Sequence, residues 1–248
     1  MNSQQYSTRA QAPASYPNLA LPTLVRSNIN DGLALKPSGR ANLDNSGKVK
    51  ADPFIKRKKP IIVSTFNTNT LRSNCKRAEL AHEAHQLGVD IICLQEHRID
   101  HTESLLQQKF ANTYTLITCS AWKNSINAST GGVGFLISPS ALKACLEIKK
   151  HSNRIIEITL NGSPATTIFS CYSPHNEYSE EDVAQFYDEL SSAVYSVPAH
   201  NLVVIDGHVD AHFTISSVTN RNGLLLKDFM DEHNLLATNT RFQHRNGR

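Results

Sequence analysis

Short, continuously apolar segments alternate with helix-forming segments from residue 60 onward. Residues 61–66 (IIVSTF), 90–95 (DIICLQ) and 202–205 (LVVI) are short and rich in β-branched or other apolar side chains. Such segments are typical of strands that are buried on both faces. Segments with apolar residues at helical spacing lie between them. The alternation predicts an α/β protein with a buried sheet.

The remaining predicted elements follow from periodicity and turn signals. Leu80, Ala81, Ala84 and Leu87 recur at helical spacing, and Gly88 is a natural helix stop. Further strands are predicted at 131–137, 154–160, 166–172 and 235–238, with Asn161-Gly162 as a hairpin turn, and further helices start at Ser179 and at Asn222 or Gly223. Ser179 to Asp182 resembles a capping box, with Asp in place of Glu.

Residues 1–58 differ from the rest of the chain. They are rich in Ser, Asn, Ala, Pro and Gly and show no sustained apolar period. Such a stretch buries too little apolar surface to offset the entropy of ordering it. We therefore predict a disordered leader over 1–58 and a single domain over 59–248. The basic cluster at 56–59 is either a solvated linker or a nuclear-import or nucleic-acid-contacting patch.

Bulk composition excludes some protein classes. The chain has 248 residues, 40% of them hydrophobic, which is enough for one sizeable core, and its formal charge of +3 says little about partners. It contains no apolar run long enough to span a bilayer and no secretory signal. We expect an intracellular protein without a membrane partner. Its five scattered cysteines form no CxxC pair and predict free, mostly buried thiols.

Polar side chains stand where the predicted strands end. They are Asn67, Glu96, Tyr172, His208 and Asp210. Strand ends place side chains at one rim of a sheet, where clefts form. A carboxylate and an amide at such a rim suit a hard cation with oxygen ligands, such as Mg²⁺. Each residue alone has an ordinary alternative role, such as a turn cap, a solvated charge or a core aromatic.

Five segments in order resemble the motifs of the endonuclease/exonuclease/phosphatase family, in its LINE-type retrotransposon endonuclease and craniofacial development protein 2-like branch. They are residues 66–72 (FNTNTLR), 92–98 (ICLQEHR), 131–135 (GGVGF), 171–176 (CYSPHN) and 204–212 (VIDGHVDAH). Residues 222–225 (NGLL) and 239–244 (NTRFQH) also resemble the family's segments C-terminal to these motifs. The resemblance implies a four-layer α/β sandwich of two mixed sheets flanked by helices, incomplete at the C-terminus.

The resemblance also implies roles for individual residues. Glu96 would bind Mg²⁺ or Mn²⁺, with Asn67 beside the metal and the phosphate. Tyr172 would support the scissile phosphate, while Asn176 and Arg98 would contact the nucleic acid. A metal and hydrogen-bond donors would neutralise the charge that develops on a phosphodiester during hydrolysis. The implied partner is DNA, cleaved as a phosphodiester, and the oligomeric state stays open.

Two departures from the family pattern affect the predicted activity. His208 stands where the family has the Asp that orients the attacking water, and Asp210 stands where it has a neutral phosphate-binding Asn. The chain also ends before the family's final metal-side Asp and its acid–base His–Asp pair. The histidines outside that context, at 97, 175, 212 and 244, are interpreted as surface or supporting residues. His208 could itself act as a base near neutral pH.

These departures leave three functions open. The first is a weak or inactive metal-dependent DNA endonuclease of retrotransposon origin, in the nucleus rather than the cytoplasm. The second is a non-catalytic remnant or nucleic-acid-binding domain on the same fold. The third is a phosphomonoesterase. DNA nicking titrated against Mg²⁺ separates an enzyme from a non-enzyme, and a small phosphomonoester separates the two enzymes.

Overall fold

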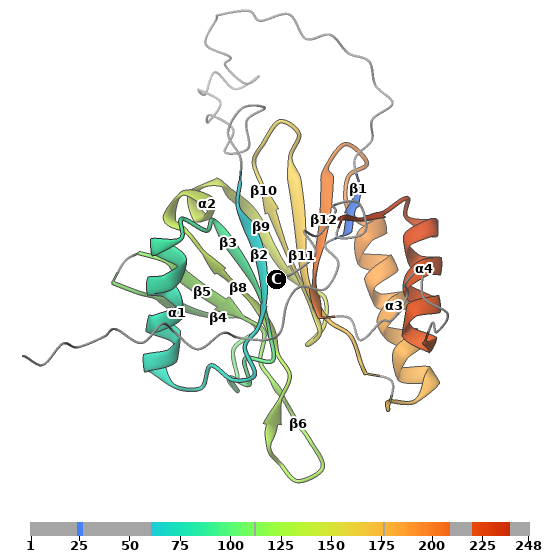
Figure 1. Ribbon diagram of the computed structural model, residues 1–248, viewed down its shortest axis with the longest axis horizontal. Coiled ribbons are helices and arrows are strands. Elements are labelled where there is room, and N and C mark those ends of the chain that lie inside the picture. Colours follow the sequence, from blue (N-terminus) through green and yellow to red (C-terminus); the bar gives the residue numbers. More distant parts are fainter. Residues whose placement is uncertain (1–23, 27–60, 112, 176, 209–219, 239–248) are drawn as a thin grey trace, which may run out of the picture.

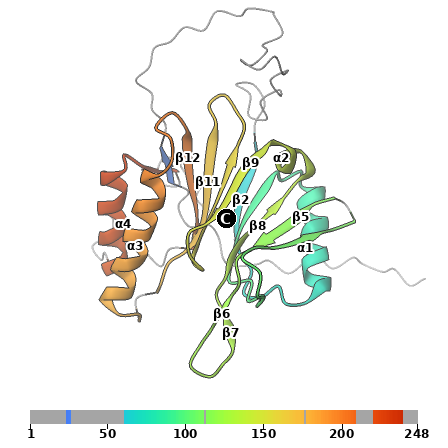
Figure 2. The same ribbon diagram turned by 180° about the vertical axis from the view of Figure 1, so that it is seen from behind.

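Two β-sheets pack face to face and carry helices on their outer faces (Figure 1). The computed structural model describes residues 24–26, 61–111, 113–175, 177–208 and 220–238. One outer face is covered by α1 (Asn74–Gln86), and the other by α3 (Glu180–Tyr195) and α4 (Arg221–Glu232). The view from behind shows the same four layers (Figure 2). The predicted four-layer α/β sandwich is confirmed.

The five-stranded sheet has the order β2-β3-β8-β5-β4. Its strands are β2 (Val63–Asn67), β3 (Ile91–Gln95), β8 (Val133–Ile137), β5 (Thr115–Thr118) and β4 (Leu106–Lys109). β2 and β3 are parallel, whereas the other neighbours are antiparallel. The parallel pair brings the carboxyl ends of β2 and β3 to the same end of the sheet.

The six-stranded sheet has the order β13-β1-β12-β11-β10-β9. Its strands are β13 (Leu236–Ala237), β1 (Leu24–Arg26), β12 (Leu202–His208), β11 (Thr166–Tyr172), β10 (Ile155–Leu160) and β9 (Cys145–Lys150). β11 and β12 are its parallel pair. A separate hairpin of β6 (Trp122–Lys123) and β7 (Ser129–Thr130) projects from one end of the sandwich (Figure 1).

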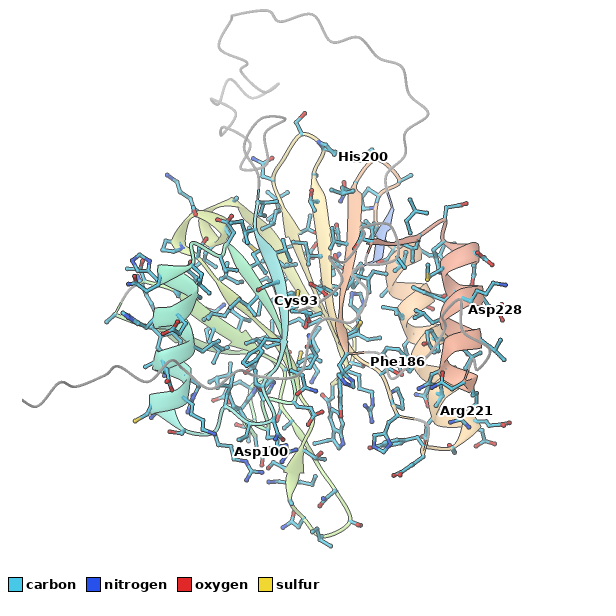
Figure 3. All side chains as sticks on the ribbon, viewed as in Figure 1. Cys93, Asp100, Phe186, His200, Arg221 and Asp228 are labelled. Carbon is cyan, nitrogen blue, oxygen red and sulfur yellow. The ribbon has the colours of Figure 1, made fainter. Side chains whose placement is uncertain are left out.

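Three apolar clusters hold the four layers together. One packs α3 and α4 against the six-stranded sheet, one lies between the sheets, and one packs α1 against the five-stranded sheet. The short helix α2 (Pro139–Ala144) connects the sheets and adds Ala141 to the middle cluster. Figure 3 places the side chain of Cys93 near the centre of the molecule and that of Phe186 on α3. Ile91 and Cys93 of β3 lie in the cluster between the sheets, whereas Ile92 and Leu94 lie in the cluster under α1, so alternate residues of β3 belong to two cores.

Several predicted details are confirmed. Gly88, at φ +65°, follows the end of α1, and Ser179 caps α3 by accepting a hydrogen bond from the backbone N–H of Asp182 at 3.1 Å. β10 and β11 form the predicted hairpin, although its connection is longer than a two-residue turn. All five cysteines are free, and Cys93, Cys119 and Cys171 are buried. No helix among the described residues could cross a membrane.

Other details are corrected by the structure. Leu87 is 70% exposed and does not belong to the apolar face of α1. Residues 24–26 lie in the predicted disordered leader, yet they form β1 between β12 and β13, because both of these strands offer backbone groups for pairing. The rest of the leader, with its basic end at 56–59, lies outside the described residues. The edge strands β4 and β9 were not predicted because their half-exposed sequences lack an apolar run.

Candidate functional site

Four polar side chains from both sheets meet at one end of the sandwich. Asn67 is the last residue of β2, and Glu96 directly follows β3. Tyr172 and His208 are the last residues of β11 and β12 and are register partners, so His208 belongs to the strand rather than following it. β12 starts after His200, which Figure 3 places at the upper end of the molecule, opposite Asp100. The predicted gathering at one rim is thus present for these four residues.

The carboxylate of Glu96 is held by three donors. Its Oε1 accepts hydrogen bonds from Asn67 Nδ2 at 2.8 Å and from the Tyr172 hydroxyl at 3.0 Å. Its Oε2 accepts one from Arg98 Nη2 at 3.2 Å, which is also an ion pair. Because each carboxylate oxygen has two lone-pair directions, Oε1 is saturated and Oε2 keeps one free. Glu96 therefore presents one available oxygen at the rim.

These donors also decide the charge of Glu96. Burial alone would raise the pKa of this carboxyl group, but the three hydrogen bonds and the positive charge of Arg98 lower it below its ordinary value. Burial, and then the Glu96 charge, raise the pKa of Tyr172 well above its ordinary value. Near neutral pH the site thus holds an ionised carboxylate beside a protonated phenol. The free oxygen of Glu96 can bind a cation, while the single O–H of Tyr172 is donated to Glu96 itself.

The backbone after β3 is held in an unusual conformation. Glu96 and Arg98 have φ angles of +54° and +55°, a region that non-glycine residues rarely adopt. His97 between them is fully buried: its Nδ1 accepts from the Ile99 N–H at 3.0 Å, and its Nε2 donates to the Val133 carbonyl at 3.2 Å. Burial lowers the His97 pKa to about 4, so the ring is neutral. His97 is therefore a supporting residue, as its sequence context predicts.

The glycine pair of the GGVGF segment makes room for this support. Gly132 has φ +89°, and a Cβ there would lie 2.5 Å from His97 Cε1. Gly131 has φ +65°, and a Cβ there would collide with the ring of Trp122. The Gly131 carbonyl also accepts a hydrogen bond from the Arg98 N–H at 2.9 Å. The glycines thus let His97 and Trp122 pack directly against the backbone behind Glu96.

A buried polar layer joins the two sheets beneath the rim. The Thr65 hydroxyl donates to Gln95 Oε1 at 3.1 Å, and Gln95 Nε2 donates to the Ser170 hydroxyl at 3.2 Å. Ser170 in turn donates to the Leu94 carbonyl at 3.2 Å. Buried polar groups with their partners satisfied fix one arrangement of the elements that carry them. This layer sets the position of β3 relative to β11, and hence of Glu96 relative to Tyr172.

The site offers oxygen ligands for the divalent metal that the sequence predicts. Glu96 offers one carboxylate oxygen, and the Asn67 amide oxygen, which accepts from the Asn69 N–H at 3.1 Å, keeps one lone pair. The described residues contain no group of three or more His, Cys, Asp or Glu side chains that could hold a metal. Mg²⁺ is commonly held by one or two carboxylates, substrate phosphates and several waters. Glu96 and Asn67 fit such a substrate-assisted site and do not form a closed protein cage.

Arginine side chains add positive charge around the rim. Arg72 donates to the carbonyls of Arg98 at 3.1 Å and Ser129 at 2.8 Å, and Arg77 donates to the Arg72 carbonyl at 3.0 Å. Arg154 donates to the Tyr172 carbonyl at 3.2 Å. Within the described part of the chain, Arg98 alone of these four pairs with a carboxylate. Neutral carbonyl partners leave the charges of Arg72 and Arg77 uncompensated, which favours an anionic ligand at the rim.

Sequence reasoning located part of this site and missed part of it. Asn176 and Asp210, two of the predicted residues, lie outside the described residues. The residues that it missed are Thr65, Gln95, Ser170, Arg72, Arg154 and Trp122. No motif marks the buried hydroxyls, whose partners come from the other sheet. Trp122 carried one usable signal, because it is the single tryptophan of the chain.

Comparison with known proteins gives a family match and several structural matches. The Endonuclease/Exonuclease/phosphatase family model matches residues 64–205, more than half of the 248-residue chain. Among solved structures, the endonuclease domain of TRAS1, a telomere-specific non-LTR retrotransposon, is similar at 15% identity and TM-score 0.48, over 71% of this chain and 73% of that one. A search of the curated proteins finds no match.

Two further similar structures are described as AP endonucleases. The enzyme from Archaeoglobus fulgidus is 16% identical with TM-score 0.49, over 70% of this chain and 71% of that one. The enzyme from Leishmania major is 11% identical with TM-score 0.49, over 74% and 72% of the two chains.

Proposed function

Because the chain belongs to the endonuclease/exonuclease/phosphatase family, we propose that it is a divalent-metal-dependent phosphodiester hydrolase that acts on DNA with low turnover. The observation that carries the proposal is the ionised Glu96 carboxylate, which is shared by Asn67 and the Tyr172 hydroxyl at a rim rich in arginine. One side of this arrangement suits a cation. The other side suits a phosphate.

Each group has a chemical task in this proposal. Glu96 and Asn67 would hold Mg²⁺ or Mn²⁺, which would act as a Lewis acid toward a phosphoryl oxygen. The Tyr172 hydroxyl stays protonated, and its single O–H, which donates to Glu96 in this structure, would turn to a phosphate oxygen when a strand binds. Arg98 and the other guanidinium groups would orient the strand. Asn176 is a further proposed phosphate-backbone contact.

Low turnover is expected from the groups at the carboxyl end of β12. His208 packs against Tyr172, with ring centroids 5.7 Å apart, in the place of the water-orienting Asp of the family. Asp210 follows in the place of a neutral phosphate donor, where its charge would repel the substrate. Each general acid–base group contributes about 10²- to 10⁴-fold to a rate. Replacement of the water-orienting Asp and of the neutral phosphate donor should therefore slow cleavage.

The amino-acid sequences of the motifs support a retrotransposon-derived endonuclease. The basic cluster at 56–59 supports a nuclear location and DNA as the partner. Neutralising this cluster should lower DNA affinity and reduce its dependence on salt.

A supercoiled-plasmid nicking assay with Mg²⁺ or Mn²⁺ tests the proposal. The wild type should nick slowly, Glu96→Gln should not nick, and the double variant His208→Asp/Asp210→Asn should nick faster than the wild type. A small phosphomonoester should not be hydrolysed. Nicking that is independent of added metal, or equal in wild type and Glu96→Gln, would overturn the proposal.

A second candidate function is DNA binding without cleavage. The substitution of His208 for the water-orienting Asp favours it, since this change leaves the arginine-rich rim in place. Binding of duplex DNA together with no nicking by the wild type, at any metal concentration, would select this candidate over the hydrolase.

A further inference from the structure

A cavity of about 290 Å³ lies beside Tyr172, between the β9–β10 turn, the loop after β11 and α3. The lining residues that matter here are Trp122, Arg154, Tyr178, Asp182, Gln185 and Glu189. Ligand pockets start at roughly 300 Å³. The cavity is therefore large enough for one small ring system and too small for several nucleotides.

Flat groups form one side of the cavity. The guanidinium carbon of Arg154 lies 4.3 Å from the centroid of the Trp122 ring and 5.1 Å from that of Tyr178. Trp122 is itself fixed from behind by Gly131, and Arg154 is fixed by its hydrogen bond to the Tyr172 carbonyl. Aromatic rings and a guanidinium plane at a cavity wall are surfaces of the kind on which unpaired bases stack. The flat wall thus favours a planar, aromatic ligand.

Charged and amide groups of α3 also line the cavity. Asp182 and Glu189 bring two carboxylates, and Glu189 Oε1 accepts a hydrogen bond from Gln185 Nε2 at 2.9 Å. Two carboxylates against the single cation Arg154 disfavour a phosphate inside the cavity. They do accept hydrogen bonds from amino groups, and Gln185 adds both a donor and an acceptor. A neutral heterocycle with an amino group matches this wall.

The cavity is linked to the candidate catalytic rim by one residue. Tyr172 donates through its hydroxyl to Glu96 and accepts from Arg154 through its carbonyl. Its ring also packs near Trp122, with centroids 6.1 Å apart. A nucleic-acid strand whose phosphate lies at the Tyr172 hydroxyl would therefore pass the mouth of the cavity.

We propose that this cavity binds one unpaired nucleobase that carries an exocyclic amino group, supplied by the strand whose phosphodiester lies at Glu96. The inference rests on the proposed function, because the strand is the substrate proposed for the rim. Arg154 and the aromatic rings stack the base, and Glu189 accepts a hydrogen bond from its amino group. The cavity thereby selects unpaired adenine, guanine or cytosine over thymine or uracil beside the cleavage position.

The single tryptophan makes the inference directly measurable. Trp122 lines the cavity, so its fluorescence reports on occupancy. The full chain is titrated with adenosine, guanosine, cytidine, uridine and ribose. Adenosine, guanosine and cytidine should quench the fluorescence and bind about fivefold or more tightly than uridine, since a good side-chain pair to a base edge discriminates at least that much. No quenching by any nucleoside, or equal binding of uridine, would overturn the inference.

A matched pair of variants on α3 tests the amino-group contact. Glu189→Gln should reduce the preference over uridine to about twofold or less, because a neutral amide is a weaker acceptor. Glu181→Gln changes the same residue type on an exposed part of the same helix outside the cavity and should keep the wild-type preference. A preference that survives Glu189→Gln contradicts the assignment of this acceptor.

The titration also separates this inference from the proposed function. Nucleosides carry no phosphodiester, so their binding does not depend on hydrolysis. A chain that nicks DNA while no nucleoside quenches Trp122 refutes the cavity assignment alone. A chain that binds amino-bearing nucleosides but never nicks DNA supports the cavity and refutes the hydrolase.

Discussion

The two sheets reach the same rim by different means. On the five-stranded sheet, Glu96 stands outside regular structure, at a left-handed φ angle that is supported by buried His97 and the adjacent glycine pair. On the six-stranded sheet, Tyr172 and His208 are ordinary strand residues in parallel register, positioned by ring packing. Strain held by packing is typical of functional positions. The position of Glu96 should therefore depend on His97 and the glycine pair, whereas the position of Tyr172 should depend on its own contacts.

The largest expected effect is at Glu96 itself. Glu96→Gln removes the negative charge that faces the metal while keeping the size of the side chain. Loss of one supporting group around a metal typically costs about 10- to 100-fold in affinity or activity, and loss of the carboxylate itself should cost about a thousandfold in nicking rate. Calorimetric titration with Mn²⁺ should show no binding to the variant. Equal Mn²⁺ affinities would remove Glu96 from the site.

The support behind Glu96 should appear in the pH dependence of stability. The His97 pKa is lowered from 6.5 to about 4 by burial, so the unfolded chain binds the proton more readily than the folded one. This stabilising contribution is complete above about pH 6.5 and is lost as pH falls toward 4. It amounts to roughly 3 kcal/mol. Denaturant unfolding from pH 7 to pH 4 should therefore show a steeper loss for the wild type than for His97→Gln, and equal slopes would contradict the assignment.

On the other sheet, the expected effect is smaller and is confined to one hydroxyl. Tyr172→Phe removes the donor at 3.0 Å from Glu96 Oε1 and should lower the nicking rate by about 10- to 100-fold. Tyr195→Phe is the matched control, because its hydroxyl also donates to a carboxylate, that of Glu232 at 2.7 Å, on the exposed surface of α3. The control should nick at the wild-type rate. Equal losses in both variants would mean that Tyr172 acts only through general stability.

The smallest effect is expected at the contact of Trp122, in the β6–β7 hairpin, with Gly131 directly after that hairpin. Gly131 and Gly88 share a φ angle of +65°, but a Cβ at Gly88 meets nothing within 4 Å, whereas one at Gly131 meets the Trp122 ring. The strain of the φ angle is thus common to Gly131→Ala and Gly88→Ala. The difference in their free energies of unfolding isolates the contact and should be about 1–2 kcal/mol. A difference near zero would show that Trp122 can move away freely.

The element pattern and several strand ends could be predicted from the sequence alone. Apolar runs such as 91–94 mark strands because most side chains buried on both faces of a sheet are apolar. Glu96 and Tyr172 could be singled out because polar residues directly after such runs must leave the core. These properties depend on residues that are close together in the sequence, so they can be predicted from the sequence alone.

Other features depend on contacts between distant segments, and only the tertiary structure decides them. Ser170 finds its partner Gln95 across the sheet interface, 75 residues away. Arg154 acquires its stacking surfaces from Trp122 of β6 and from Tyr178 in the loop after β11. Residues 24–26 become a strand because β12 and β13 offer them backbone partners, although their own segment has no periodic pattern. The sequence determines the chemistry of each side chain. Tertiary packing determines which partners shift its pKa, fix its orientation and line its cavity.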